Sequence, residues 1–236
     1  MPKHLHRQMD KLKREVLSLG AVVEDGVRKA VQALEGRDAA LAEDVIKRDV
    51  DVDQAEVNLE EECLKILALY QPVAIDLRFI VAVLKLNSDL ERIGDLAVNI
   101  AERALYISEH GAAQFPLDFG KMAREAQQML KMSLDALVNM DARLAREVCA
   151  ADDAVDAINR QMYIQVQESI RKTPEHMEGL IHLLSASRHL ERIADHATNI
   201  AEDVVYMVEG EIIRHRAEDY RDGTAGGEGA GDPGQG

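Results

Sequence analysis

The stretch LERIGDLAVNIAE (Leu90–Glu102) recurs as LERIADHATNIAE (Leu190–Glu202), with ten of thirteen positions identical. On a helix of 3.6 residues per turn, its Leu, Ile and Ala positions form one stripe, and its Glu, Asp and Asn positions form another. A long repeat of this kind indicates a duplicated helical unit. It therefore favours an all-α protein built from two similar halves.

Long Pro-free intervals rich in helix-forming residues surround both copies. They predict helices over 4–35, 38–70, 75–110, 117–139, 141–172 and 175–210. A short Gly- and Pro-containing linker at 111–116 separates the third predicted helix from the fourth. We therefore expect two tandem three-helix bundles, over 1–112 and 113–215. The remaining residues, 216–236, are Gly-rich and predicted to be disordered.

The composition of the 236 residues agrees with this helical class and excludes several functions. Aromatic residues make up 3% and charged residues 30%, which is atypical of an all-β protein. The net charge of −15 repels a phosphate backbone, so we expect no nucleic-acid partner. Two isolated cysteines, no secretory signal and no membrane-spanning apolar run predict a cytoplasmic protein.

Each half also carries two acidic pairs of the form [ED]xxxD, one on its second predicted helix and one on its third. The pairs are Asp49/Asp53 with Glu91/Asp95, and Asp152/Asp156 with Glu191/Asp195. Carboxylates four residues apart lie on one helix face and repel each other. The second helices of the two halves have otherwise diverged strongly. Retention of the pairs therefore indicates a function that needs them.

A multivalent cation would convert this repulsion into coordination, because carboxylate oxygens suit hard metals such as Fe³⁺, Mn²⁺, Mg²⁺ or Ca²⁺. Asn99 and Asn199 could add oxygen ligands two turns along the third helices, and Glu102 and Glu202 could do the same. The alternative is a solvated face whose acids pair with Arg92 and Arg192. His189 and His196 flank the second acidic pair, but we interpret them as helix-surface residues and not as ligands.

The two repeat copies, the DxxVD starts of the preceding helices and QPVAIDLRFI (Gln71–Ile80) together resemble the PhoU family. This resemblance implies two three-helix bundles related by pseudo-two-fold symmetry. It also implies a multinuclear metal cluster on the acidic motifs, with iron expected foremost and zinc, manganese, magnesium or calcium as alternatives. By motif position the ligands would be Asp49, Asp53, Glu91, Asp95, Asp152, Asp156, Glu191 and Asp195.

The resemblance further implies a non-enzymatic negative regulator of the phosphate-starvation response that modulates high-affinity phosphate uptake. Its expected partners are a phosphate ABC transporter and a sensor histidine kinase, with membrane association only through them, and the expected assembly is a homodimer. Two alternatives stay open. One is a carboxylate-bridged metal storage or metalloenzyme bundle, although no histidine here follows a Glu by three residues. The other is a structural helical adaptor whose acidic stripes bind nothing.

Overall fold

The structure, a computed structural model, describes residues 3–110 and 118–210, and these residues form six long helices and one short 3₁₀ turn. The helices are α1 (Lys3–Gly36), α2 (Ala39–Tyr70), α3 (Ala74–His110), α4 (Phe119–Asn139), α5 (Ala142–Lys172) and α6 (Met177–Glu209), and the turn is η1 (Pro174–His176). Every predicted helix is present, with ends within two residues of those expected. The predicted boundary at 112/113 and the tail 216–236 lie outside the described residues.

Aspartate caps explain where three of the helices begin. Asp38 accepts a hydrogen bond from the Leu41 amide at 3.0 Å, and Asp118 accepts one from the Lys121 amide at 2.8 Å. Asp141 accepts from the Arg143 and Leu144 amides, both at 3.0 Å. Each cap satisfies an amide that lacks a partner within its helix, which is worth about 1 kcal/mol. These caps fix the starts of α2, α4 and α5.

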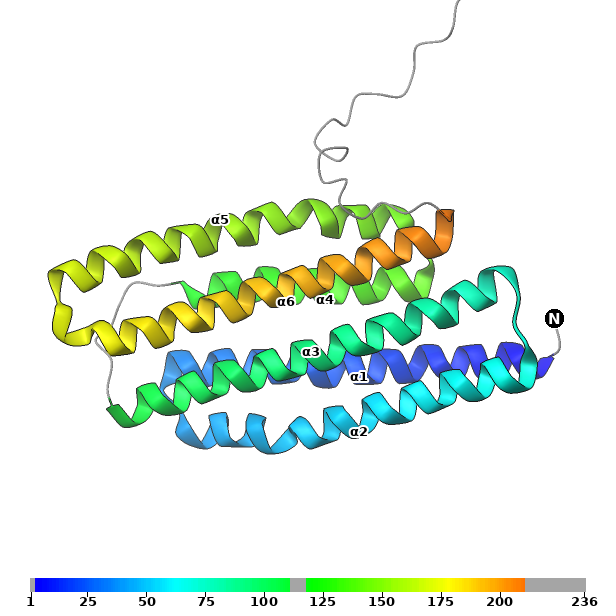
Figure 1. Ribbon diagram of the computed structural model, residues 1–236, viewed down its shortest axis with the longest axis horizontal. Helices are drawn as coiled ribbons and strands as arrows, with labels where there is room; N and C mark the ends of the chain where they lie inside the picture. Colours follow the sequence, from blue (N-terminus) through cyan, green and yellow to red (C-terminus); the bar gives the residue numbers. More distant parts are fainter. Residues whose placement is uncertain (1–2, 111–117, 211–236) are drawn as a thin grey trace, which may run out of the picture.

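The six helices form two three-helix bundles that pack side by side (Figure 1). In the first bundle α1, α2 and α3 contact one another, and in the second α4, α5 and α6 do so. The bundles join through α3 against α6 and α1 against α4, which places α2 and α5 on the two outer edges (Figure 1). One continuous apolar core includes residues from both bundles. The expected pair of tandem bundles is therefore confirmed.

Polar contacts tie α3 to α6 along the seam between the bundles. Lys85 Nζ donates to Asp203 Oδ1 at 3.0 Å, and the Asp203 side chain is buried. Asp89 Oδ1 lies 2.8 Å from His196 Nδ1. Farther along, the rings of Tyr106 and His182 stack with centroids 3.7 Å apart. The two bundles are thus joined by specific contacts as well as by apolar packing.

The seam also corrects one expectation from the sequence. His196 is partly buried against Asp89 of the other bundle, so it is not an ordinary surface histidine. His189 also faces the seam, where its Nδ1 is buried without a hydrogen-bond partner among the described residues. Burial, followed by the charges of Arg103, Arg192 and Arg188, lowers the pKa of His189 to about 4. The repeat did not reveal this because it aligns α3 with α6 but does not show that they touch.

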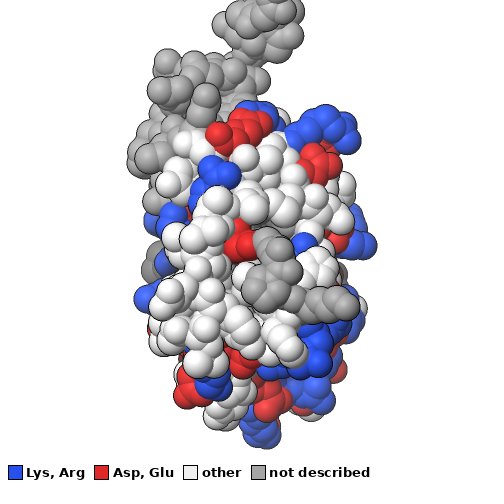
Figure 2. Space-filling model, turned by 90° about the vertical axis from the view of Figure 1, so that its right-hand side faces the viewer, with Lys and Arg blue, Asp and Glu red and all other residues white. Residues whose placement is uncertain are grey.

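The end of the molecule where α2 turns into α3 exposes apolar side chains. Figure 2 views this end, where charged residues of both signs lie mostly toward the margins. The turn exposes Leu69 and Val73, which are 74% and 73% accessible to solvent. Gln71 and Ala74 both adopt positive φ here, at 46° and 50°, on either side of Pro72. This end therefore presents apolar side chains on a tightly bent backbone.

Candidate metal centre

The acidic pairs of the first bundle lie beside the packing stripes of their helices. On α2 the buried residues Val45, Val52 and Leu59 face the core, and Asp49 is half-buried next to them. On α3 Glu91 and Asp95 are half-buried next to the fully buried Ile93. Because the acids adjoin the packing stripes, they lie along the edge where α2 meets α3, as the expected converging arrangement requires.

A glycine in the repeat lets the two helices approach closely at this edge. A Cβ atom added to Gly94 would lie 3.1 Å from Val52 Cγ1 and 3.5 Å from Asp49 Oδ1. The carboxylate of Asp49 on α2 thus lies against the α3 backbone, one residue from Asp95. In the second bundle the matching position is Ala194, which is fully buried. The second bundle therefore accommodates a methyl group where its two helices meet, whereas the first bundle has a glycine at the matching position.

Neighbouring acidic residues across the gap between α2 and α3 raise the pKa values of Asp49 and Glu91 in the first bundle. Partial removal from water, then the charges of Asp53, Asp95 and Glu91, raise the pKa of Asp49 to about 6. The pKa of Glu91 is raised by partial burial and then by Asp95, with a smaller contribution from Asp53. All four carboxylates named by the motif therefore belong to one electrostatic cluster.

The second bundle repeats this arrangement. Partial burial, then Asp195, Asp156, Asp153 and Glu191, raise the pKa of Asp152 to about 6. Partial burial followed by Asp156 raises the pKa of Asp195. Partial burial followed by Asp195 and Asp156 raises the pKa of Glu191. The α5 and α6 pairs consequently converge as the α2 and α3 pairs do.

Two observations bear on whether these acidic clusters bind a metal ion. Arg92 lies 3.6 Å from Glu91 and 3.8 Å from Asp95, and Arg160 lies 3.9 Å from Asp156, so part of the acidic charge is paired. Across the described ranges 3–110 and 118–210, no three His, Cys, Asp or Glu side chains stand close enough together to hold a metal ion. The assignment of these carboxylates as metal ligands therefore stays a prediction.

Asn99 and Asn199 are placed less favourably than the acidic residues for binding a metal ion. The side-chain amide of Asn99 donates to the Asp95 carbonyl of its own helix at 2.8 Å, which leaves its side-chain oxygen for another role. Asn199 is exposed on α6. Neither asparagine is drawn into the acidic cluster by a contact of the described structure. Their ligand role also stays a prediction.

The chemistry of the cluster nevertheless fits a hard cation. Its donors are all oxygen atoms on partly buried carboxylates whose mutual repulsion a positive ion would relieve. The carboxylates lie on the outer edge of each bundle and not inside its core, unlike the sites of ferritin-like bundles. A metal held by these oxygen atoms would therefore lie at the surface of each bundle, and its presence stays a prediction.

Glu56 is an acidic neighbour that the repeat motifs did not identify. Partial burial, then Glu60, Glu91 and Asp53, raise its pKa, and its carboxylate oxygen accepts a hydrogen bond from Asn87 at 2.9 Å. Glu56 lies three residues after Asp53, on the same face of α2. That helical spacing could have revealed it, but the second half has Asn159 at the matching position, so comparison of the halves concealed it.

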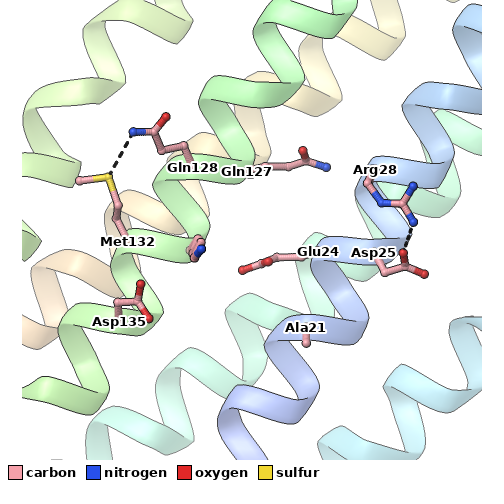
Figure 3. A pocket seen from close by; sticks show the side chains of 9 residues that line it. Ala21, Glu24, Asp25, Arg28, Gln127, Gln128, Met132 and Asp135 are labelled. Carbon is pink, nitrogen blue, oxygen red and sulfur yellow. Dashed lines mark hydrogen bonds and ion pairs between the residues drawn. The ribbon is translucent and has the colours of Figure 1, made fainter.

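A separate cleft of about 720 Å³ lies between α1 and α4, where the bundles meet away from the α3–α6 seam. Figure 3 shows its lining residues on the two helices, with Asp25 paired to Arg28. Burial raises the pKa of Glu24 there, while the charge of Lys131 opposes that rise. Acidic, basic and amide side chains are mixed in the lining. The cleft therefore favours no single class of ligand.

Comparison with known proteins places this architecture among relatives that match it over most of its length. A family model described as the PhoU domain matches residues 16–104 and again 119–204. A phosphate-specific transport system accessory protein PhoU homolog of Aquifex aeolicus is 37% identical over 212 residues, covering 90% of this chain and 96% of that one. One from Pseudomonas aeruginosa is 36% identical over 214 residues, covering 90% and 88%.

Solved structures agree with the sequence comparison. The crystal structure of PhoU from Pseudomonas aeruginosa superposes with a TM-score of 0.83 at 36% identity, over 87% of this chain and 99% of that one. The crystal structure of the phosphate transport system regulatory protein PhoU from Streptococcus pneumoniae gives a TM-score of 0.80 at 30% identity, over 88% and 98%. None of the described helices is long and apolar enough to cross a membrane.

Proposed function

The chain belongs to the PhoU domain family, and from this membership we propose that it is an accessory protein of a phosphate-specific transport system. The observation that carries the proposal is the match of the family model to both bundles. Relatives more than 30% identical over nine-tenths of the chain are named as accessory proteins of that system. Their names describe no enzyme, which supports a non-enzymatic role.

In more detail, we propose a negative regulator of the phosphate-starvation response that modulates high-affinity phosphate uptake. It would act in the cytoplasm as an adaptor between a phosphate ABC transporter and a sensor histidine kinase, in a homodimer. Rigid helices tied together by the α3–α6 seam suit an adaptor, because two partners can be held at a fixed separation. The charge of −15 disfavours anionic lipid, so membrane association would come through partners.

Metal binding at the two acidic clusters is part of this proposal. A hard cation would neutralise the carboxylates whose charges help to raise the pKa values of Asp49 and Asp152. Asp49, Asp53, Glu91 and Asp95 would hold it in the first bundle, with the matching four residues in the second. Bound there, a cation would fasten α2 to α3 and α5 to α6 along their exposed edges, giving the adaptor two stiffened surfaces.

The exposed α2–α3 turn supports a docking role for one end of the molecule. Leu69 and Val73 are the two most exposed large apolar side chains of the described residues. The corresponding turn of the second bundle is polar, with Thr173 and Glu175 flanking Pro174. Apolar surface of this kind gains free energy when a protein partner covers it. The two bundles would therefore contact their partners differently.

Deletion of the gene provides the test of the regulatory role. We expect phosphate-responsive genes to become active in phosphate-rich medium, and a plasmid copy to restore their repression. Expression can be followed with a reporter fused to a phosphate-starvation promoter. Normal repression in the deletion strain, in an organism without a second copy, would contradict the proposal.

A further inference from the structure

A groove between α5 and α6 lies next to the second acidic cluster and has a different chemistry. It encloses about 420 Å³, within the range of roughly 300–1,000 Å³ found for small-molecule sites. Its lining comes from both helices and comprises Asn159, Arg160, Tyr163, Ile164, Leu184, Arg188 and Glu191. The groove therefore combines two guanidinium groups with an aromatic ring and aliphatic side chains.

Both arginines of this lining, and its Tyr163 and Ile164, are exposed to solvent. Arg188 is exposed and makes no hydrogen bond or ion pair with the rest of the described chain. Arg160 is held by its own helix, with Nε donating to the Asp156 carbonyl at 3.2 Å and the guanidinium 3.9 Å from the Asp156 carboxylate. Tyr163 and Ile164 are 50% and 55% exposed. The groove thus offers one arginine that is paired with Asp156, a second arginine without such a pair, and two exposed apolar side chains.

The first bundle has the same groove position but not the same chemistry. Ser187 donates to Asn159 at 3.0 Å in the second bundle, and Asn87 donates to Glu56 at 2.9 Å in the first, which fixes the equivalence of the helices. In that register Val57 and Ser88 stand where the second bundle has its two arginines. Glu60 and Glu61 stand where it has Tyr163 and Ile164. The basic and aromatic lining is therefore particular to the second bundle and is not required by the shared fold.

We propose that the α5–α6 groove binds a small organic phosphate of the nucleotide class. Guanidinium groups bind phosphate through directed, charge-assisted hydrogen bonds, so Arg160 and Arg188 would hold the phosphate. The exposed ring of Tyr163 would stack on the planar base, with Ile164 beside it. The amide nitrogen of Asn159, whose oxygen is already bonded to Ser187, and the carboxylate of Glu191 supply a donor and an acceptor for hydroxyl groups.

This site goes beyond the proposed regulatory function and does not require it. It differs from the metal cluster in its two arginines and its exposed apolar side chains, and Glu191 is the one residue that belongs to both sites. Inorganic phosphate would use only the two arginines, and a nucleoside would use only the apolar wall. A nucleotide would use both, and its affinity should therefore exceed that of either part.

Calorimetric titration of the full-length protein with AMP, adenosine and inorganic phosphate tests the proposal. A chelator in the buffer removes any route through bound metal. We expect saturable AMP binding, with adenosine and inorganic phosphate each at least about tenfold weaker. Arg188→Ser and Tyr163→Glu place the first bundle's residues in the groove, and each should weaken AMP binding by about tenfold or more. Circular dichroism would confirm that both exposed substitutions leave the helices intact.

Arg143→Ser is the matched control, because it makes the same replacement at an exposed position outside the groove, near the start of α5. It should leave AMP affinity within about twofold of the unmodified protein, since distant surface charges are largely screened. Three results would overturn the proposal. They are no saturable AMP binding, AMP binding no tighter than that of inorganic phosphate, and equal effects of Arg188→Ser and Arg143→Ser.

Discussion

The negative charge on two particular carboxylates destabilises the folded protein. Asp49 and Asp152 occupy equivalent places in the two bundles, and the pKa of each is raised to about 6 by partial burial and by neighbouring acids. A raised pKa means that the folded state destabilises the ionised form. At neutral pH both residues therefore oppose folding unless a cation reaches them.

We predict that Asp49→Asn stabilises the metal-free protein at neutral pH by up to about 1 kcal/mol after allowance for solvent screening. Between the ordinary pKa of 3.8 and the folded pKa of about 6, the folded state binds more protons than the unfolded state. The unmodified protein therefore loses stability as pH rises through this window, and the gain from Asp49→Asn should shrink as pH falls toward about 4. Urea unfolding at several pH values measures this.

Asp51→Asn provides the control for that experiment, because Asp51 is an exposed carboxylate on the same helix. It should change the free energy of unfolding by less than about 0.5 kcal/mol at any pH tested. An Asp49→Asn protein that is less stable than the unmodified one at neutral pH without metal would refute the repulsion described for this cluster.

His189 acts in the opposite direction over an overlapping pH range. Its folded pKa of about 4 lies below the ordinary 6.5, so below pH 6.5 the unfolded state binds a proton that the folded state excludes. Stability due to this residue is lost as pH falls. We predict that His189→Leu flattens the loss of stability between about pH 6.5 and 4, whereas His4→Leu, at an exposed position, does not. Parallel acid-unfolding curves for both variants would contradict the burial of His189.

Helix contacts between the two bundles depend on small residues at particular positions. Gly20 on α1 packs against Leu134 on α4, and a Cβ atom there would overlap the Leu134 side chain. A Cβ atom on Gly26, two turns along α1, would meet only Ala97 Cβ at 4.0 Å, an ordinary contact. The two glycines therefore sit on the same helix in different packing environments.

We predict opposite effects for the same substitution at these two sites. Gly26→Ala should stabilise the protein by about 0.5–1 kcal/mol, because alanine favours the helix and finds room. Gly20→Ala should destabilise it by about 1–2 kcal/mol, because the cost of overpacking exceeds that gain. Thermal or urea unfolding gives both values. Stabilisation by Gly20→Ala would show that α1 and α4 are not in the close contact described.

Helix boundaries were the most predictable feature of the chain. Proline, glycine and capping aspartates stop and start helices through local geometry, so the sequence around Asp38, Pro72 and Asp141 suffices to place those ends. The acidic face of α3 was equally predictable, since the repeat shows Glu91 and Asp95 on one side of a helix. Both inferences need only interactions between residues close in the sequence.

For the molecule as a whole, the contacts between the bundles could not be predicted. The pairs Lys85–Asp203 and Asp89–His196 join residues more than one hundred positions apart, and their partners are not equivalent under the repeat. The groove between α5 and α6 was missed for a related reason. Arg160, Tyr163 and Arg188 look like solvated residues on separate helices until the fold brings them together.

The Lys85–Asp203 ion pair should be a measurable part of what holds the two bundles together. Lys85 is 40% exposed at its side chain while Asp203 is 6% exposed, so the pair is only partly screened by water. We predict that Lys85→Met destabilises the protein by about 1–2 kcal/mol, less than the loss of a fully buried pair. Lys47→Met, which breaks an exposed pair with Glu43, should cost no more than about 0.5 kcal/mol. Equal costs in urea unfolding would contradict a structural role for the seam.

The metal content of protein purified without chelators tests the proposed acidic sites most directly. Elemental analysis should find at least one hard metal ion per bundle in the unmodified protein. Replacement of Asp49, Asp53, Glu91 and Asp95 by Asn or Gln should remove the metal of the first bundle and leave that of the second. The matching replacements at Asp152, Asp156, Glu191 and Asp195 should do the reverse. Sub-stoichiometric metal in the unmodified protein, or content unaffected by either set, would show that the acidic clusters are not metal sites.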